Sequence, residues 1–107
     1  MKDDKIYLIS IQESIENIQE YTKNGLEEFM RTKIIQDAVI RNLEIVGEAT
    51  KKISKELRSS RTDIPWREIT GLRDVLIHDY MGVDLRIVWN IVEKELPKLK
   101  EKIGQLF

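Results

Sequence analysis

Hydrophobic residues return every three or four positions along most of this chain, which is the spacing of a helix with one buried face. No segment shows the strict alternation of polar and β-branched residues that is typical of a strand. A first helix is predicted over residues 3–23. It should end at Asn24 and Gly25, because both residues tolerate the left-handed conformation found at helix ends. Its buried face consists of Leu8, Ile11, Ile15 and Ile18.

The second apolar stripe is the longest and predicts a single helix over residues 27–57. Glu27 and Glu28 suit its N-terminal end, because the helix dipole favours negative charge there. The stripe is formed by Ile35, Ala38, Asn42, Ile45, Ala49, Ile53 and Leu57, flanked by Val39, Leu43 and Val46. The buried amide of Asn42 needs hydrogen-bond partners, so a structural role inside the bundle is its simpler interpretation.

The third and fourth helices are predicted from their first residues. A polar loop over residues 58–64 leads to Pro65, which is predicted to open a helix that reaches residue 80. Asp84 suits the N-cap of the last helix. Pro97 falls within the apolar stripe of that helix, so a kink or a break into two helices is expected near Leu96.

These helices predict one all-α domain over residues 1–107, an antiparallel bundle of four to five helices. A bundle of this size has a limited core. Burial of further apolar surface between two copies would stabilise it, and we therefore expect a homodimer.

Composition excludes several kinds of chemistry. The absence of cysteine removes disulfides, thiol catalysis and cysteine-bound metals. A single histidine argues against a metal site, because zinc usually takes three or four protein ligands, and no cofactor is expected. No apolar run is long enough for a membrane span or a signal peptide. We expect a cytoplasmic protein with no membrane partner.

The net charge of −1 conceals a basic segment. Residues 51–73 hold seven basic and three acidic side chains, a net of +4. Besides Arg73, the basic residues are Lys51, Lys52, Lys55, Arg58, Arg61 and Arg67. Two interpretations remain open: a solvated helix end with its loop, or a patch that contacts the phosphates of RNA.

The segment of residues 71–80 has the most distinctive chemistry. It holds the only histidine, His78, with Arg73 five residues before it and Tyr80 two residues after it. An imidazole can deprotonate a 2′-hydroxyl or protonate a leaving 5′-oxygen, and a guanidinium can stabilise charge on a phosphate. Asp74 is four residues before His78 and could orient the imidazole.

Simpler interpretations exist for each of these residues. A histidine near a helix C-terminus can interact with the helix dipole, an arginine can serve a salt bridge, and a tyrosine can lie at the edge of the core. On a regular helix, positions 73 and 78 are about 140° apart. Arg73 and His78 would converge only at a distorted helix end or across a dimer.

The pattern Arg73-x4-His78-x-Tyr80 resembles the signature of the HEPN superfamily, and more closely that of its HepT-like toxin branch. The flanking stretches 63–66 and 80–84 match it as well, and residues 36–49 are similar to the long second helix of that family. The resemblance therefore covers nearly the whole chain.

The resemblance implies an all-α homodimer acting as a metal-independent endoribonuclease, with paired motifs at a cleft between protomers. Arg73 and His78 match the catalytic pair, and Asp74 matches the polar residue that often follows the motif arginine. Tyr80 matches the tyrosine that a minimal nucleotidyltransferase antitoxin, MntA-like, modifies with AMP. The chain would then be the toxin of a toxin–antitoxin pair.

Asn42 and Glu48 are further candidates for a role near the motif, and two other functions are compatible with the sequence. If Asn42 is not purely structural, it would, together with Glu48, hold or orient the Arg73 side chain without contacting the substrate itself. Instead of an RNase toxin, the chain could be a non-catalytic dimeric scaffold that binds a nucleotide or RNA for a partner nucleotidyltransferase. It could also be a structural helical dimer without a ligand.

Overall fold

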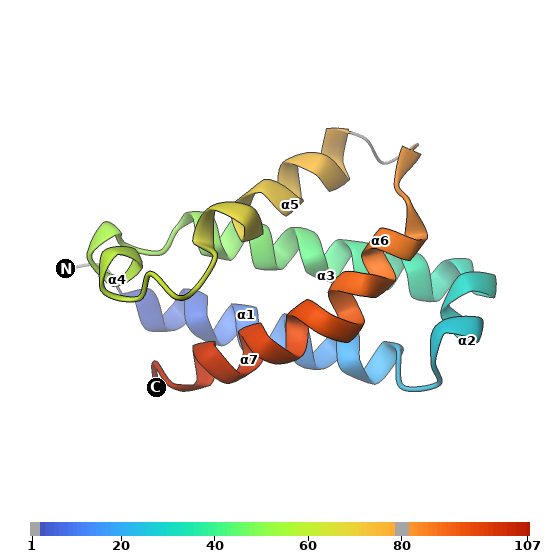
Figure 1. Ribbon diagram of the computed structural model, residues 1–107, viewed down its shortest axis with the longest axis horizontal. Helices are drawn as coiled ribbons and strands as arrows, with labels where there is room; N and C mark the ends of the chain where they lie inside the picture. Colours follow the sequence, from blue (N-terminus) through green and yellow to red (C-terminus); the bar gives the residue numbers. More distant parts are fainter. Residues whose placement is uncertain (1–2, 79–81) are drawn as a thin grey trace.

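Two long helices, α1 (Asp4–Tyr21) and α3 (Lys33–Lys51), run antiparallel and pack along each other in the centre of the fold (Figure 1). The computed structural model describes residues 3–78 and 82–107, and its side chains outside residues 73–78. The carboxylate of Asp3 accepts the backbone N–H of Lys5 at 3.1 Å and so caps α1. Gly25, at φ 95°, turns the chain after α1. The first predicted helix is confirmed to within two residues at each end.

The predicted single helix over residues 27–57 is wrong, because the chain breaks at Thr32 and turns again after Lys51. A short helix, α2 (Leu26–Arg31), precedes α3. Thr32 has an extended backbone between them, at φ −120° and ψ 100°. Gln36 stabilises the break, since its side-chain amide donates to the carbonyls of Phe29 at 2.9 Å and Met30 at 3.1 Å. These carbonyls would otherwise continue the helical ladder.

The predicted loop over residues 58–64 is also partly wrong, because α4 (Lys55–Ser60) occupies its first residues. Ser54 caps α4, with its hydroxyl oxygen accepting the N–H of Leu57 at 3.2 Å. The carboxylate of Asp4, from the start of α1, accepts the N–H of Ser54 at 2.8 Å and its hydroxyl at 2.6 Å. This contact fixes the turn after α3 against the first helix.

The last part of the chain follows the prediction more closely. Asp84 caps α6 (Leu85–Asn90) by accepting the N–H of Arg86 at 2.9 Å, as predicted. A π-helical turn (Ile91–Glu95) then leads into α7 (Leu96–Gly104). Pro97 lies at the start of α7, and the N–H of Leu96 bonds to the carbonyl of Ile91, five residues back. The break expected near Leu96 is therefore a change of helix type.

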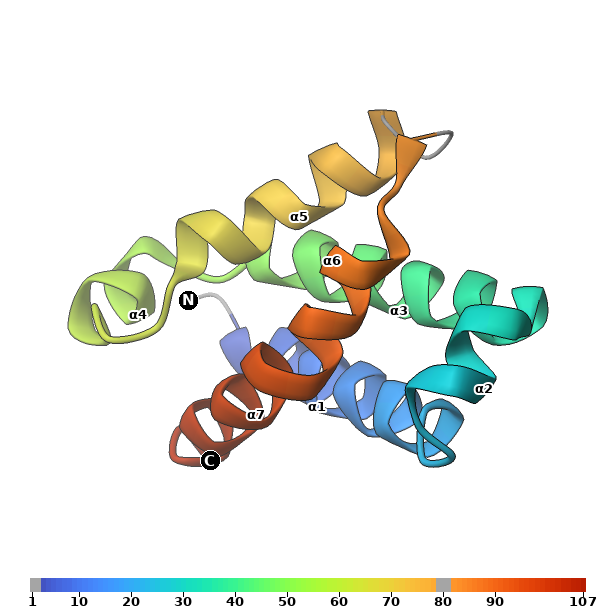
Figure 2. The same ribbon diagram turned by 45° about the vertical axis from the view of Figure 1, so that its right-hand side comes forward.

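The core lies where α1, α3 and α7 meet, and α5 (Trp66–His78) packs along α3 (Figure 2). The buried face of α3 is rotated from the predicted stripe, so that the predicted flank forms its centre. The fully buried apolar residues of these helices include Ile11, Ile15, Ile18, Val39, Leu43, Val46 and Ile103. Within residues 3–78 and 82–107 the regular structure is helical throughout, and the predicted all-α class is confirmed. None of the described helices is both long and apolar enough to cross a bilayer.

Candidate nucleic-acid site

Helix α5 carries the segment in which the sequence places the chemistry. Pro65 precedes it, and Trp66 at its first turn is buried, with its indole N–H donated to the carbonyl of Arg61 at 2.9 Å. Ile69 is buried one turn later. These contacts anchor the N-terminal half of α5 and fix the direction in which the helix runs over α3.

The motif positions lie in the C-terminal half of α5. Arg73, Asp74 and His78 belong to this helix, whose regular backbone extends through His78. Their side chains, and the whole of Tyr80, lie outside the described residues. The chain re-enters the described structure just before α6, so the motif end of α5 lies close to the start of α6 (Figure 2).

Asn42 has both ends of its side-chain amide occupied. Its Nδ2 donates to the carbonyl of Ala38 at 2.9 Å, and its Oδ1 accepts from Nδ2 of Asn17 at 3.3 Å. The residue is only 8% exposed. The bond to Asn17 therefore links α3 to α1, as expected if Asn42 has a structural role.

Glu48 lies on a different side of α3 from Asn42. It is exposed and lines a hollow of about 480 Å³ between α1 and α3, together with Tyr7 and Lys52. A separate apolar groove lies between α5 and the last helical segments, lined by Ile69, Leu72 and Leu99 among others, and Glu48 is not part of it.

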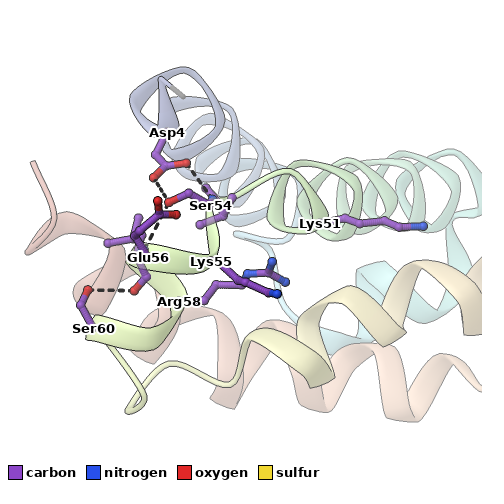
Figure 3. Close-up of a pocket in the computed structure, with 9 residues that line it drawn as sticks. Asp4, Lys51, Ser54, Lys55, Glu56, Arg58 and Ser60 are labelled. Atoms are coloured by element: carbon purple, nitrogen blue, oxygen red, sulfur yellow. Dashed lines mark hydrogen bonds between the residues drawn. The ribbon is translucent and has the colours of Figure 1, made fainter. Parts of the chain in front are cut away.

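The predicted basic patch divides into parts with different surroundings. Lys51, Lys55 and Arg58 line one hollow of about 840 Å³ at the end of α3 and along α4 (Figure 3). Lys52 turns to the other side of α3, where its Nζ lies 5.9 Å from the centre of the Tyr7 ring.

Arg67 is exposed and lines an adjoining hollow, of about 430 Å³, at the start of α5. Arg58 lines this hollow too. The two hollows therefore share Arg58 and form one concave surface that extends from α4 to the first turn of α5.

Arg61 is held by Asp63 and Gln105, and these three residues form a clamp within the chain. Its guanidinium donates to both carboxylate oxygens of Asp63, at 2.9 and 3.0 Å, and to Oε1 of Gln105 at 2.9 Å. Lys102 adds a bond of 2.6 Å to the Asp63 carbonyl. The hydrogen bond with Arg61 lowers the pKa of Asp63, and the same bond raises the pKa of Arg61. Its contacts set Arg61 apart from the rest of the predicted RNA-binding patch.

The concave basic surface and the motif lie at opposite ends of α5. The surface includes Trp66 and Arg67 at the first turn of this helix, whereas His78 is its last residue. At 1.5 Å per residue, the twelve steps from Trp66 to His78 span about 18 Å. The basic surface and His78 are thus separated by the length of α5, although they belong to adjoining segments of the sequence.

Sequence comparison places this helical bundle in a known class of nucleases. The family model described as Ribonuclease HepT-like matches residues 11–106. The chain belongs to this HEPN-type ribonuclease family, as the motif predicted, and its assignment as an endoribonuclease is confirmed.

Individual relatives agree with this assignment. A Thermococcus cleftensis protein named "Probable ribonuclease HepT" is 47% identical over 103 residues, which cover 95% of this chain and 94% of that protein. A longer protein of Methanocaldococcus jannaschii, named "Gamma-glutamylcyclotransferase and putative RNase", is 53% identical over 103 residues. Those residues cover 95% of this chain but only 46% of that relative, so the chain spans about half of its length. No solved structure matches the chain.

Sequence reasoning missed the contacts that shape the basic surface. Asp4 and Ser54 fix the turn before α4, and Asp63 withdraws Arg61 from the surface. The signal available in the sequence was Ser54 directly before Lys55-Glu56, since serine is a frequent helix N-cap. The partner 50 residues away, Asp4, leaves no local signal.

Proposed function

We propose that the chain cleaves RNA without a metal, using the motif Arg73-x4-His78-x-Tyr80. The observation that carries the proposal is the match to the HepT-like ribonuclease family, which spans the whole motif. In the proposed reaction the 2′-oxygen of RNA attacks the adjacent phosphorus, and the bond from phosphorus to the 5′-oxygen breaks. His78 takes the 2′-hydroxyl proton, the imidazolium so formed gives a proton to the leaving 5′-oxygen, and Arg73 stabilises the charge on the phosphate.

We further propose that two copies of the chain form the working unit. Helix α5 keeps its regular backbone through His78. Positions 73 and 78 of a regular helix are about 140° apart. A second copy that presents its own motif would allow an arginine and a histidine to face one phosphate, which supports the expected homodimer with its cleft between protomers.

We propose that Tyr80 is the site of control. It follows His78 by two positions, so AMP on its hydroxyl would add bulk and phosphate charge within the motif and repel RNA. The modifying enzyme would be a minimal nucleotidyltransferase, the antitoxin of a toxin–antitoxin pair in the cytoplasm. Family membership and the position of this tyrosine in the motif support the proposal.

The test is cleavage of a mixed RNA pool in EDTA by the purified wild type and by His78→Ala. Intact mass is measured first, so that any AMP on Tyr80 is known. We expect cleavage by the wild type and a loss of at least about 100-fold in the variant, because general acid–base catalysis contributes at least that factor.

Circular dichroism of both proteins provides the control for folding. Equal cleavage by wild type and variant would remove His78 from the mechanism. No cleavage by folded, unmodified wild type would overturn the nuclease proposal and favour the scaffold that binds a nucleotide or RNA.

A further inference from the structure

The hollow beside α4 holds cations that no described residue neutralises. Lys51, Lys55 and Arg58 line it, and none of the three forms an ion pair within the described part of the chain. The Nε of Arg58 is buried and lacks a hydrogen-bond acceptor among the described residues. The charge of the Arg58 guanidinium is therefore not compensated by a hydrogen bond at Nε, and its remaining N–H groups are the ones that could meet an external acceptor.

Two acidic residues, Asp4 and Glu56, line the same hollow, so its three basic residues leave a net charge of +1. The carboxylate of Asp4 is held by the N–H and hydroxyl of Ser54. Glu56 is the other acidic residue of the lining. In Figure 3 the side chains of Lys55 and Arg58 extend toward the same side of α4, whereas Asp4 turns to Ser54. The side of α4 to which Lys55 and Arg58 extend is therefore cationic.

We propose that Lys51, Lys55 and Arg58 form a phosphate-binding subsite that holds the RNA backbone away from the site of cleavage. The inference rests on the proposed nuclease function. Lysine and arginine contacts to phosphates supply affinity without reading the sequence. Arg58 also lines the hollow that contains Arg67, so the subsite continues toward the first turn of α5.

The location of the subsite determines which substrates it affects. The start of α5 is separated from His78 by about 18 Å along the helix axis. Consecutive phosphates rise by about 3.4 Å along one strand of a duplex, so one strand needs several nucleotides to reach both places. The subsite therefore favours RNA of some length, and a dinucleotide bound at the motif cannot contact the subsite of the same copy.

The experiment compares wild type with Lys55→Gln/Arg58→Gln on two substrates, a single-stranded RNA of about 16 nucleotides and a dinucleotide. We expect KM for the long RNA to rise roughly tenfold, kcat to stay the same, and the kinetics of the dinucleotide to be unchanged. The slope of log affinity against log salt should flatten by about 0.7 for each lost contact. Lys51→Gln/Lys55→Gln removes two exposed lysines and serves if the first variant does not fold.

The matched control is Lys23→Gln/Lys33→Gln, which removes the same charge at the far ends of α1 and α3. Equal losses in the control, equal losses on both substrates, or no loss on the long RNA would each overturn the subsite. Binding of the long RNA by His78→Ala, with and without the subsite changes, measures the subsite independently of cleavage. A failure of the proposed nuclease and a failure of the subsite are thereby distinguishable.

Discussion

At the scale of single residues, the hydrogen-bond partners of a buried polar side chain indicate its role in this bundle. Asn42 lies on the buried side of α3, yet both ends of its amide are bonded, to Ala38 and Asn17. Such a pair of bonds stabilises the packing of α3 on α1. A hydrogen bond of this kind contributes about 1 kcal/mol, and an unsatisfied partner raises the cost of losing it.

We expect Asn42→Ala to lower the free energy of unfolding by about 1–2 kcal/mol and to leave RNA cleavage per folded molecule unchanged. Asn17→Ala, at an exposed position, should cost less. Chemical denaturation and initial cleavage rates provide the two measurements. A loss of cleavage that exceeds the loss of folded protein would show instead that Asn42 supports Arg73.

Residue identity alone predicted the kind of chemistry, but it did not predict which basic side chains are paired within the fold and which are not. The spacing of Arg73, His78 and Tyr80 is sufficient to indicate the family. The basic residues of segment 51–73 look equivalent in the sequence. In the structure Arg61 is bound to Asp63, while Arg58 is left without an acceptor at Nε among the described residues. Part of the difference is local, since Asp63 is two residues from Arg61, and part comes from Gln105 across the fold.

At the scale of elements, the break between α2 and α3 shows how a helix can end without proline or glycine. Thr32 is β-branched but otherwise ordinary, and periodicity continues across it. The determinant is Gln36, whose amide replaces the lost backbone donors to Phe29 and Met30. The break lets the ring of Phe29 become fully buried and pack against Trp89, with ring centres 5.4 Å apart.

We expect Gln36→Ala to destabilise the fold by about 1–2 kcal/mol, because two carbonyls lose their donor. Gln36→Glu is the matched substitution, since it keeps the size but cannot donate when ionised. It should be at least as damaging. Thermal unfolding followed by circular dichroism measures both. Stability equal to wild type in either variant would show that water or the backbone satisfies these carbonyls.

At the scale of the whole molecule, the sequence predicted the helical class, the first helix and the Asp84 cap. It missed the breaks at Thr32 and Lys51 because each is maintained by the hydrogen bonds of one side chain, Gln36 in the first turn of α3 and Asp4 at the start of α1. The π-helical turn was anticipated only as an irregularity caused by Pro97. Periodicity thus predicts which segments are helical and only roughly which face is buried, whereas helix ends depend on the hydrogen bonds of particular side chains.

The clamp of Arg61, Asp63 and Gln105 connects the middle of the chain to its last helical turn. Its charged pair depends on the ionised form of Asp63. Because Arg61 lowers the pKa of Asp63 in the folded chain, the pair adds stability above the unfolded pKa of an aspartate, about 4. This contribution is lost as the pH falls through the folded pKa.

We therefore expect Asp63→Asn to lower Tm at pH 7 and to match the wild type once the pH is well below about 4. Asp37→Asn, which breaks the exposed pair of Asp37 with Lys33, is the control and should change Tm little. Melting curves from pH 2 to 7 give the comparison. A difference for Asp63→Asn that stays constant over this range would contradict a contribution from ionisation.

Both ends of the described chain are held near α4, since Asp4 binds Ser54 and Gln105 accepts from Arg61 (Figure 1). The end of α5 that bears His78 points the other way. An affinity tag or a fused domain attached at either end would therefore leave the motif uncovered. It would emerge near α4, beside Ser54 at one end or Arg61 at the other, so tags should be removed before RNA affinity is measured.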